Sequence, residues 1–289
     1  MHYEGAIFRP PSEAQSILLQ VTIGCSHNRC GFCGSYREKR FRIQDDAIIQ
    51  EDLRFAAMHF PDTRRLFLCD GDALIMPQPR LIGLLQKINT HLPHLERIGS
   101  YANAKSLARK TLQELVDLRS RGLKVIHMGL ESGDDETLRQ MNKWGTVREI
   151  IEQGKKVTDA GITLFVTVIL GLGGTKRSEI HARQTGKALT EMKPDLIGAL
   201  SLMPVEGTEL YQRMLSGEFH CINPLQTLQE LRIMLENLDL ESGTFYSNHA
   251  SNFLPLKVRF PGGKSGALET IDNALGGAIP LRPEWMRGL

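Results

Sequence analysis

The sequence has few cysteines, no long hydrophobic run and no excess of charge of one sign. Its 289 residues include five cysteines, and Lys and Arg outnumber Asp and Glu by only 35 to 33. The most hydrophobic stretch, ITLFVTVILGLGG at 162–174, is far shorter than the roughly 20 residues that span a bilayer. The balanced charge argues against nucleic-acid binding through bulk electrostatics, although a local basic patch stays compatible with it.

The first fifteen residues, MHYEGAIFRPPSEAQ, lack the apolar core of a signal peptide, so secretion is not expected. Without a membrane span either, we expect a cytoplasmic protein. In a reducing compartment, clustered cysteines act as metal ligands or catalysts more often than as disulfides. Cys69 and Cys221 stand apart from the other three, and we expect both to be ordinary packing residues.

Short aliphatic runs alternate with helical patterns over residues 16–205. Six runs predict strands, at 17–23, 65–69, 97–101, 124–130, 163–170 and 196–202. Between them apolar residues recur at helical spacing, with the helix at 176–192 assigned mainly by its position. Such repeats form a parallel sheet with right-handed crossovers. We therefore expect an α/β fold, a partial (β/α)6 TIM-like barrel whose ligands bind at the carboxyl ends of the strands.

The chain is expected to have three regions: an N-terminal arm at 1–15, the barrel at 16–205, and a small α-rich C-terminal cap at 206–289 that carries the substrate region. Within the cap, leucines at helical spacing predict a helix at 225–240, and a short helix is expected near 266–276. The run SGTFYSNHASNFLPLKVRFPGGKSG between them is expected to be irregular.

Three of the five cysteines, Cys25, Cys30 and Cys33, lie within nine residues just after the first predicted strand. Thiolates suit zinc or an iron–sulfur cluster. A closed structural zinc site needs four ligands, and His27 offers the fourth, so a zinc-binding or interaction protein stays an alternative, as do three thiols without a metal. A [4Fe–4S] cluster held by three cysteines instead leaves one iron open to a small molecule.

This C-x4-C-x2-C motif, with aromatic Phe32 before the last cysteine, resembles that of radical S-adenosylmethionine (SAM) enzymes, whose usual spacing is C-x3-C-x2-C. The resemblance covers about 16–205 through its motifs. It implies that Cys25, Cys30 and Cys33 ligate a [4Fe–4S] cluster whose open iron binds SAM. It also implies an external one-electron donor of flavodoxin or ferredoxin type, and reductive cleavage of SAM to a 5′-deoxyadenosyl radical that abstracts hydrogen from a substrate.

Further motifs follow the other predicted strands. Asp70–Gly71–Asp72 stands where the family has a Gly-Gly-Glu-like turn for the amino group of SAM, although Asp and Gly also serve turns for backbone reasons alone. The segment GLESG, followed by DETLRQMNK, resembles a family segment and implies that Glu131 and Ser132 contact the methionine or ribose. The resemblance adds these candidates for cofactor binding: Phe32, Ser100, Asn103, Leu170, Gly171, Leu202 and Met203.

The sequence indicates the substrate less clearly than the cofactors. His127 shares a strand face with Glu131 and is a candidate substrate-site residue, although a strand histidine is more often a core residue. His249, within the polar stretch FYSNHASNFLPLKVR, is a candidate proton donor or acceptor; the alternative is a surface loop. A small-molecule substrate is favoured over RNA or protein, because Glu38 interrupts the basic stretch YREKRFR at 36–42.

Overall fold

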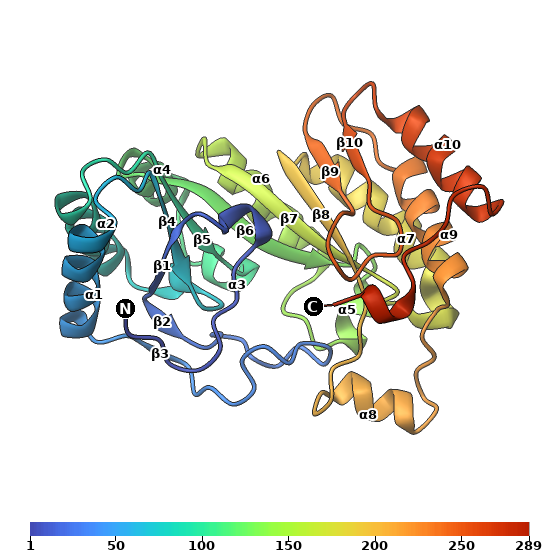
Figure 1. The fold of residues 1–289 in the computed structure, drawn as a ribbon, viewed down its shortest axis with the longest axis horizontal. Helices are drawn as coiled ribbons and strands as arrows, with labels where there is room; N and C mark the ends of the chain where they lie inside the picture. Colours follow the sequence, from blue (N-terminus) through green and yellow to red (C-terminus); the bar gives the residue numbers. More distant parts are fainter. Residues whose placement is uncertain (289) are drawn as a thin grey trace. The chain divides into compact units, whose positions relative to one another are not determined.

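The computed structural model describes residues 1–288, which divide into two compact units (Figure 1). Unit 1 comprises Met1–Asn28, Ser35–Met128 and Lys156–Leu164, and the described part of unit 2 comprises Arg29–Gly34, Gly129–Lys155 and 165–288. Strand β6 (Leu123–Glu131), helix α6 (Val147–Asp159) and strand β7 (Thr163–Leu170) each belong partly to both units.

Unit 1 is built on parallel strands joined by helices. Its strands β1 (Ile17–Gln20), β4 (Arg65–Cys69), β5 (Arg97–Tyr101) and the first part of β6 are adjacent in that order and pair in parallel. The connections carry α1 (Asp46–His59), α2 (Gln78–His91), α3 (Ala104–Leu107) and α4 (Leu112–Ser120). A short antiparallel pair, β2 (Thr22–Ile23) with β3 (Arg42–Ile43), closes the base of the cysteine loop.

In unit 2, β7 pairs in parallel with β8 (Leu196–Ser201), and β8 pairs in parallel with β9 (Thr244–Tyr246). The last strand, β10 (Lys257–Arg259), is antiparallel to β9. The helices of this unit are α5 (Asp135–Gln140), α7 (Gly174–Met192), α8 (Glu209–Leu215), α9 (Pro224–Glu236) and α10 (Lys264–Leu275). Helix α9 packs against both α7 and α10.

The predicted fold class is confirmed: the protein has an α/β fold with a mostly parallel sheet of eight strands. All six predicted strands are present, although the first, at 17–23, divides into β1 and β2, and the helix expected at 176–192 occupies 174–192. The expectation of an irregular run after α9 was wrong, because β9 and β10 extend the sheet there. Each of these strands has only three residues, too few to show an alternation of apolar and polar side chains in the sequence. Phe245 is nevertheless fully buried opposite Ile197, which explains why β9 docks on β8.

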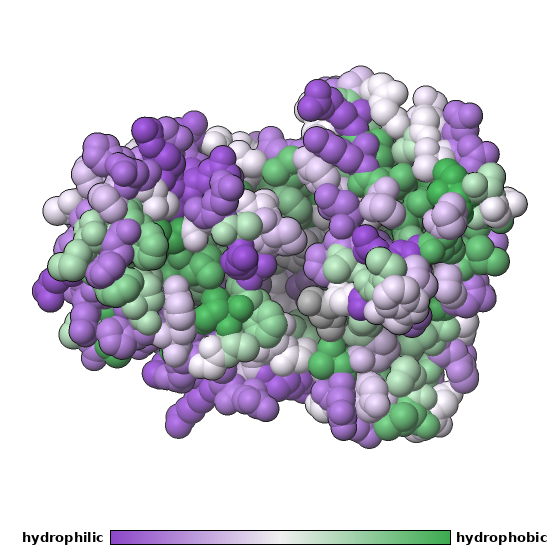
Figure 2. Space-filling model, in the orientation of Figure 1, coloured by the Kyte–Doolittle hydropathy of each residue, from purple (hydrophilic) through white to green (hydrophobic). Residues whose placement is uncertain are grey.

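Most of the surface in view in Figure 2 is hydrophilic or of mixed hydropathy. The longest helix in the described part of the chain, α7, has 19 residues, and charged side chains recur along it. Accordingly, no helix within residues 1–288 combines the length and the apolar character that a membrane span needs.

Candidate active site

In unit 1 the start of the cysteine loop is bonded to the turn that follows β4. The Gly24 N–H donates to a carboxylate oxygen of Asp70 at 2.7 Å, and the Gly71 N–H donates to the Gly24 carbonyl at 3.0 Å. A Cβ atom on Gly71 would lie 2.7 Å from Cβ of Cys25, so only glycine allows this approach. The turn at 70–72 therefore supports Cys25 directly.

Asp70 connects both ends of the cysteine loop. Its fully buried carboxylate accepts not only from Gly24 but also from the Gln20 amide at 3.0 Å and from Lys39 Nζ at 3.1 Å. The Lys39 side chain is 8% exposed, so this ion pair is largely withdrawn from water. Asp70 itself has a φ of 65°, a left-handed conformation that Asp adopts more readily than most residues. The predicted contact of Asp70 with SAM stays a prediction, whereas its bonds to the loop are observed.

Asp72 is buried and has one oxygen atom without a hydrogen-bond partner within residues 1–288. Its Oδ2 accepts from the Ser26 hydroxyl and from the Asn103 amide at 2.8 Å, but Oδ1 accepts nothing. Burial raises the pKa of Asp72 to about 6, against the opposing effect of its polar neighbours Ser106, Ser26 and Asn103. An unpartnered buried carboxylate oxygen is costly, so Asp72 is suited to receive a donor from a bound ligand.

The effect of burial on Asp72 can be tested by measuring the stability of the protein as a function of pH. The pKa of Asp72 rises on folding from its ordinary value of 3.8 to about 6. Folding therefore takes up a proton between these values, and the stability contributed by this group falls as the pH rises through that window. Asp72→Asn cannot ionise, so it is expected to gain about 3 kcal/mol relative to wild type between pH 4 and 7. Thermal unfolding of both ligand-free proteins measures the difference; a pH-independent difference would contradict it.

The other two cysteines lie in the part of the loop that belongs to unit 2. The Cys33 N–H donates to the Cys30 carbonyl at 3.2 Å, which makes a tight turn. Between them, Gly31 donates to the Met141 carbonyl at 2.7 Å and accepts from the Leu210 N–H at 2.9 Å. The turn is thereby attached to the segments that follow β6 and β8, and both thiols are partly exposed.

Phe32 lies in the same turn and packs on a hydrophobic cluster in unit 2. The buried members of this cluster are Met141, Leu172, Leu210 and Phe219, and Ile169 and Leu202 pack on it together with Phe32. The aromatic residue before the last cysteine therefore connects the loop to the ends of β7 and β8.

Glu131 ends strand β6 with a φ of 65° and is 9% exposed. Its Oε1 accepts from Lys143 Nζ at 3.0 Å. A Cβ atom on Gly129 would lie 1.9 Å from the same oxygen, so the glycine makes room for the carboxylate to fold back over the strand. The sequence missed Lys143 as a partner, although it belongs to the MNK triplet at 141–143 of the quoted motif.

Two predicted serines use their hydroxyl groups within the protein. Ser100 donates to the Tyr101 carbonyl at 2.8 Å. Ser132 lies 2.7 Å from His181 Nδ1 and accepts from the Asp134 N–H at 3.0 Å. Both serine side chains are fully buried. Their predicted contacts with a cofactor stay predictions.

A cavity of about 350 Å³ in unit 2 brings four predicted residues together. Leu170 and Gly171, at the end of β7, line it with Leu202 and Met203, which follow β8. The other lining residues are Ser201, Pro204, Cys221, Ile222, Pro224, Thr227, Phe253, Glu284 and Arg287. This cavity lies at the carboxyl ends of two adjacent parallel strands, the edge where α/β sheets bind ligands.

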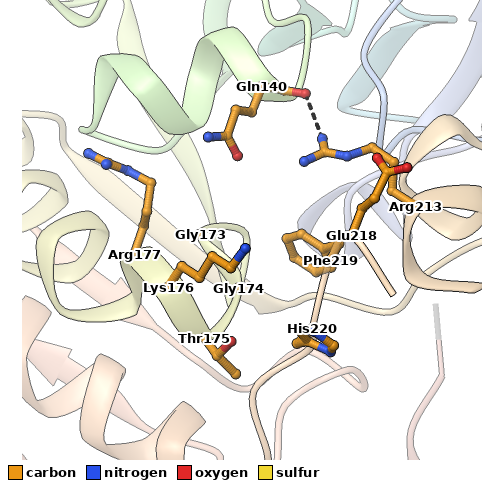
Figure 3. Close-up of a pocket in the computed structure, with 10 residues that line it drawn as sticks. All are labelled: Gln140, Gly173, Gly174, Thr175, Lys176, Arg177, Arg213, Glu218, Phe219 and His220. Atoms are coloured by element: carbon orange, nitrogen blue, oxygen red, sulfur yellow. Dashed lines mark hydrogen bonds between the residues drawn. The ribbon is translucent and has the colours of Figure 1, made fainter. Parts of the chain in front are cut away.

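A second cavity in unit 2, of about 230 Å³, has basic side chains at its wall (Figure 3). Lys176 points into it, and Arg213 donates to the Gln140 carbonyl at 3.1 Å. Arg177 instead points away, toward Asp134, with which it forms an ion pair of 2.7 Å. None of the predicted site residues lines this cavity.

His127 lies in the interior of unit 1 and is 3% exposed. Its ring meets the Phe67 and Tyr101 rings edge-on, with centroids 5.5 and 5.9 Å away, and its Nε2 lies 3.7 Å from Glu13. Burial acts to raise the pKa of Glu13, but its neighbours His127, Ser16 and Arg97 together hold that pKa below its ordinary value. A substrate contact of His127 stays a prediction.

His249 belongs to a loop that is bonded to β8. Its Nδ1 accepts from the Ser251 N–H at 3.1 Å, and burial is the main cause of its lowered pKa. Asn252 donates to the Ala199 carbonyl at 2.7 Å and accepts from the Ser201 hydroxyl at 2.8 Å. The buried Asn252 side chain therefore holds the loop against β8, and a proton-transfer role of His249 stays a prediction.

The comparison with protein families decides the identity. The sequence model of the Radical SAM superfamily matches residues 19–183, more than half of the chain. The chain belongs to the radical SAM superfamily. It is therefore an enzyme, and the cofactors of its superfamily are a [4Fe–4S] cluster and SAM, as the cysteine motif predicted.

Individual proteins also resemble the chain. An uncharacterized protein of Methanocaldococcus jannaschii is 28% identical over 133 residues, which are 46% of this chain and 41% of that protein. Coproporphyrinogen III oxidase from Escherichia coli is 17% identical with a TM-score of 0.57, over 76% of this chain and 51% of the other. Methylornithine synthase is 16% identical with a TM-score of 0.54, over 78% and 63%. The chain thus spans less than two thirds of each, and the two structures show the fold alone.

The residues fit these radical SAM cofactors. The buried Asp72 oxygen without a partner can accept a hydrogen bond from an ammonium group. The close contact of Gly71 with Cys25 places the turn at 70–72 against one of the three predicted cluster ligands. The thiols of Cys25, Cys30 and Cys33 are all partly exposed. In the part of the chain that the structure describes, no three His, Cys, Asp or Glu side chains are already grouped as for a metal ion.

Proposed function

We propose that this radical SAM enzyme holds its cluster with Cys25, Cys30 and Cys33 and initiates hydrogen abstraction from a small-molecule substrate. The observation that carries the proposal is the bonding of residues 24–26 to the turn at 70–72. It joins the first cysteine to a buried carboxylate that still lacks a donor. Three soft thiolates and one acceptor for an ammonium are what this cofactor pair requires.

Held by Cys25, Cys30 and Cys33, the cluster would supply to SAM the electron of an external donor of flavodoxin or ferredoxin type, and SAM cleaved in this way would supply the hydrogen-abstracting group. Asp72 accepts from the amino group of SAM through Oδ1, and Asn103 holds the other carboxylate oxygen in place. Glu131, oriented by Lys143, contacts the methionine or ribose.

The cavity at the ends of β7 and β8 receives the adenine ring. Leu170, Leu202 and Met203 supply apolar contacts there, and Gly171 exposes backbone at the cavity wall. Phe32 packs on the same cluster as Leu202, which couples the cysteine turn to this wall. A planar heterocycle between aliphatic side chains and backbone amides is a common way to bind a purine.

The proposal is tested under anaerobic conditions. The protein is reconstituted with iron and sulfide and reduced, and its electron paramagnetic resonance spectrum is recorded before and after SAM is added. We expect a reduced [4Fe–4S] signal that changes on addition of SAM, followed by 5′-deoxyadenosine in the product mixture. The same protein loaded with zinc alone is the control and should yield no nucleoside product.

Other outcomes redirect the proposal. Methylthioadenosine in place of 5′-deoxyadenosine would show that the other sulfonium bond breaks. One tightly held zinc per chain and no cluster would favour the structural zinc site. RNA binding that weakens steeply with salt would favour the RNA-modifying alternative over a small-molecule substrate.

A further inference from the structure

Helix α9 carries a glutamate whose burial needs an explanation. Glu230 lies beyond residues 19–183, the part that the superfamily model matches, and its side chain is 0% exposed. Glutamate is almost never fully buried unless it is paired, because its charge loses the solvation of water. The groups that stabilise Glu230 come from α7 and from the turn between β7 and α7, and they are all in unit 2.

Three polar groups face this carboxylate. Its Oε1 accepts from the Gly171 N–H at 2.5 Å and lies 3.3 Å from His181 Nε2. Its Oε2 accepts from the Ser178 hydroxyl at 2.5 Å. Hydrogen bonds to a charged acceptor are about twice as strong as those between neutral groups. Glu230 therefore binds the turn between β7 and α7 firmly to α9.

The same chain of bonds continues to the end of β6. Ser132 Oγ accepts from the Asp134 N–H and lies 2.7 Å from His181 Nδ1; because two acceptor oxygens face His181 Nε2, the serine hydroxyl is the donor to Nδ1 of the neutral ring. His181 then carries its proton on Nε2, which faces both the Ile169 carbonyl at 3.1 Å and Glu230. This tautomer follows from the hydrogen-bond partners. The bonds thus run in one direction, from Ser132 through His181 to Glu230.

Gly171 is where this network meets the cavity. It lines the cavity at the ends of β7 and β8, and its φ of 85° is a conformation that favours glycine. A Cβ atom there would lie 3.3 Å from a side-chain carbon of Ile222, another residue of the cavity wall. The bond from Gly171 to Glu230 therefore holds a flexible residue in the one conformation that shapes this wall.

We infer that Glu230 is a positioning residue for SAM binding. It acts through Gly171, at the cavity wall, and through His181 and Ser132, at the end of β6, so it aligns the two segments to which the proposed function assigns SAM contacts. This inference rests on that proposed function. It makes α9, which the sequence assigned to a substrate cap, part of the cofactor-binding machinery.

The test compares Glu230→Gln with Glu236→Gln. Glu236 lies on the same helix but is exposed and pairs with Arg232, so this control makes the same chemical change at the surface. The glutamine keeps the size of Glu230 but removes its charge and replaces one carboxylate oxygen by an amide NH2, so the bonds from Gly171 and Ser178 can no longer both be made to a charged acceptor. We expect Glu230→Gln to weaken SAM binding about 10-fold, at unchanged iron content, and Glu236→Gln to bind like wild type.

Amide hydrogen exchange in the ligand-free protein gives a readout that does not depend on the loaded enzyme. Exchange at Gly171 should accelerate in Glu230→Gln and stay unchanged in Glu236→Gln. Ser178→Ala removes only one donor to Glu230, so it should weaken SAM binding by about 3-fold and keep Gly171 protected. If Glu230→Gln fails to fold, Ser178→Ala and His181→Gln carry the test, because each changes a partner of Glu230 and leaves the carboxylate in place.

Unchanged SAM affinity in a folded Glu230→Gln protein, or in both substitute variants, would overturn the inference. If wild type binds the cluster and SAM and Glu230→Gln has the same affinity for SAM, only the role of Glu230 is refuted. Wild type that neither assembles a cluster nor binds SAM refutes the proposed function itself. A loss of affinity that merely follows a lowered melting temperature, in Glu236→Gln as well, would show general destabilisation and overturn the inference too.

Discussion

Cys30→Ala is expected to prevent retention of the [4Fe–4S] cluster and to lower 5′-deoxyadenosine formation below about one hundredth of the wild-type rate. Two thiolates would remain of the three that the motif supplies, so a second iron would lose its protein ligand. Because the Cys30 side chain is partly exposed, its truncation should leave the melting temperature of the cluster-free protein almost unchanged. Iron and sulfide content, together with product formation after anaerobic reconstitution, measure the effect.

Cys69→Ala is the matched control for Cys30→Ala. Cys69 is fully buried in β4, and burial raises the pKa of its thiol to about 12, so it stays protonated and does not act as a metal ligand. This variant should lose about 1 kcal/mol of stability and keep the cluster. Four irons retained by Cys30→Ala, or a cluster lost from Cys69→Ala, would contradict the ligand assignment.

Asp70→Ala is expected to destabilise the protein by about 3–5 kcal/mol, because it leaves the Lys39 ammonium buried without its partner. It also removes the acceptor of the Gly24 N–H, just before the first cysteine. Cluster assembly should therefore fall with stability, even though no cysteine is changed. Denaturant unfolding of the ligand-free protein and iron content after reconstitution measure the two effects.

The control for Asp70→Ala is Asp46→Ala. Asp46 also pairs with a lysine, Lys87, at 2.5 Å, but its side chain is 58% exposed. A solvent-exposed pair contributes less than about 1 kcal/mol, so this variant should assemble the cluster normally. Equal losses for Asp46→Ala and Asp70→Ala would show that burial of the Lys39 pair is not what supports the loop. Adding Lys39→Met to Asp70→Ala should recover part of the loss, because it removes the buried charge.

The sequence alone determined the barrel strands and the family. Buried parallel strands are continuous aliphatic runs, and these runs predicted all six, from Ile17–Gln20 to Leu196–Ser201. The three cysteines needed no tertiary information either, because their spacing is local and specific to a kind of chemistry. Likewise, Leu170, Gly171, Leu202 and Met203 could be expected to meet, since the carboxyl ends of neighbouring parallel strands lie on one edge.

Only the tertiary structure decided what the polar residues do. Asp70 pairs with a lysine 31 positions away, and Glu230 binds a backbone amide 59 positions away. No periodic pattern in the local sequence indicates partners that are so far away along the chain. Lys39 illustrates this: it lies in the basic stretch at 36–42, where nothing in the local sequence singles it out, yet the fold buries its side chain against Asp70. Strands β9 and β10 were missed for the same reason, since three-residue strands are stabilised by the sheet edge they join rather than by their own sequence.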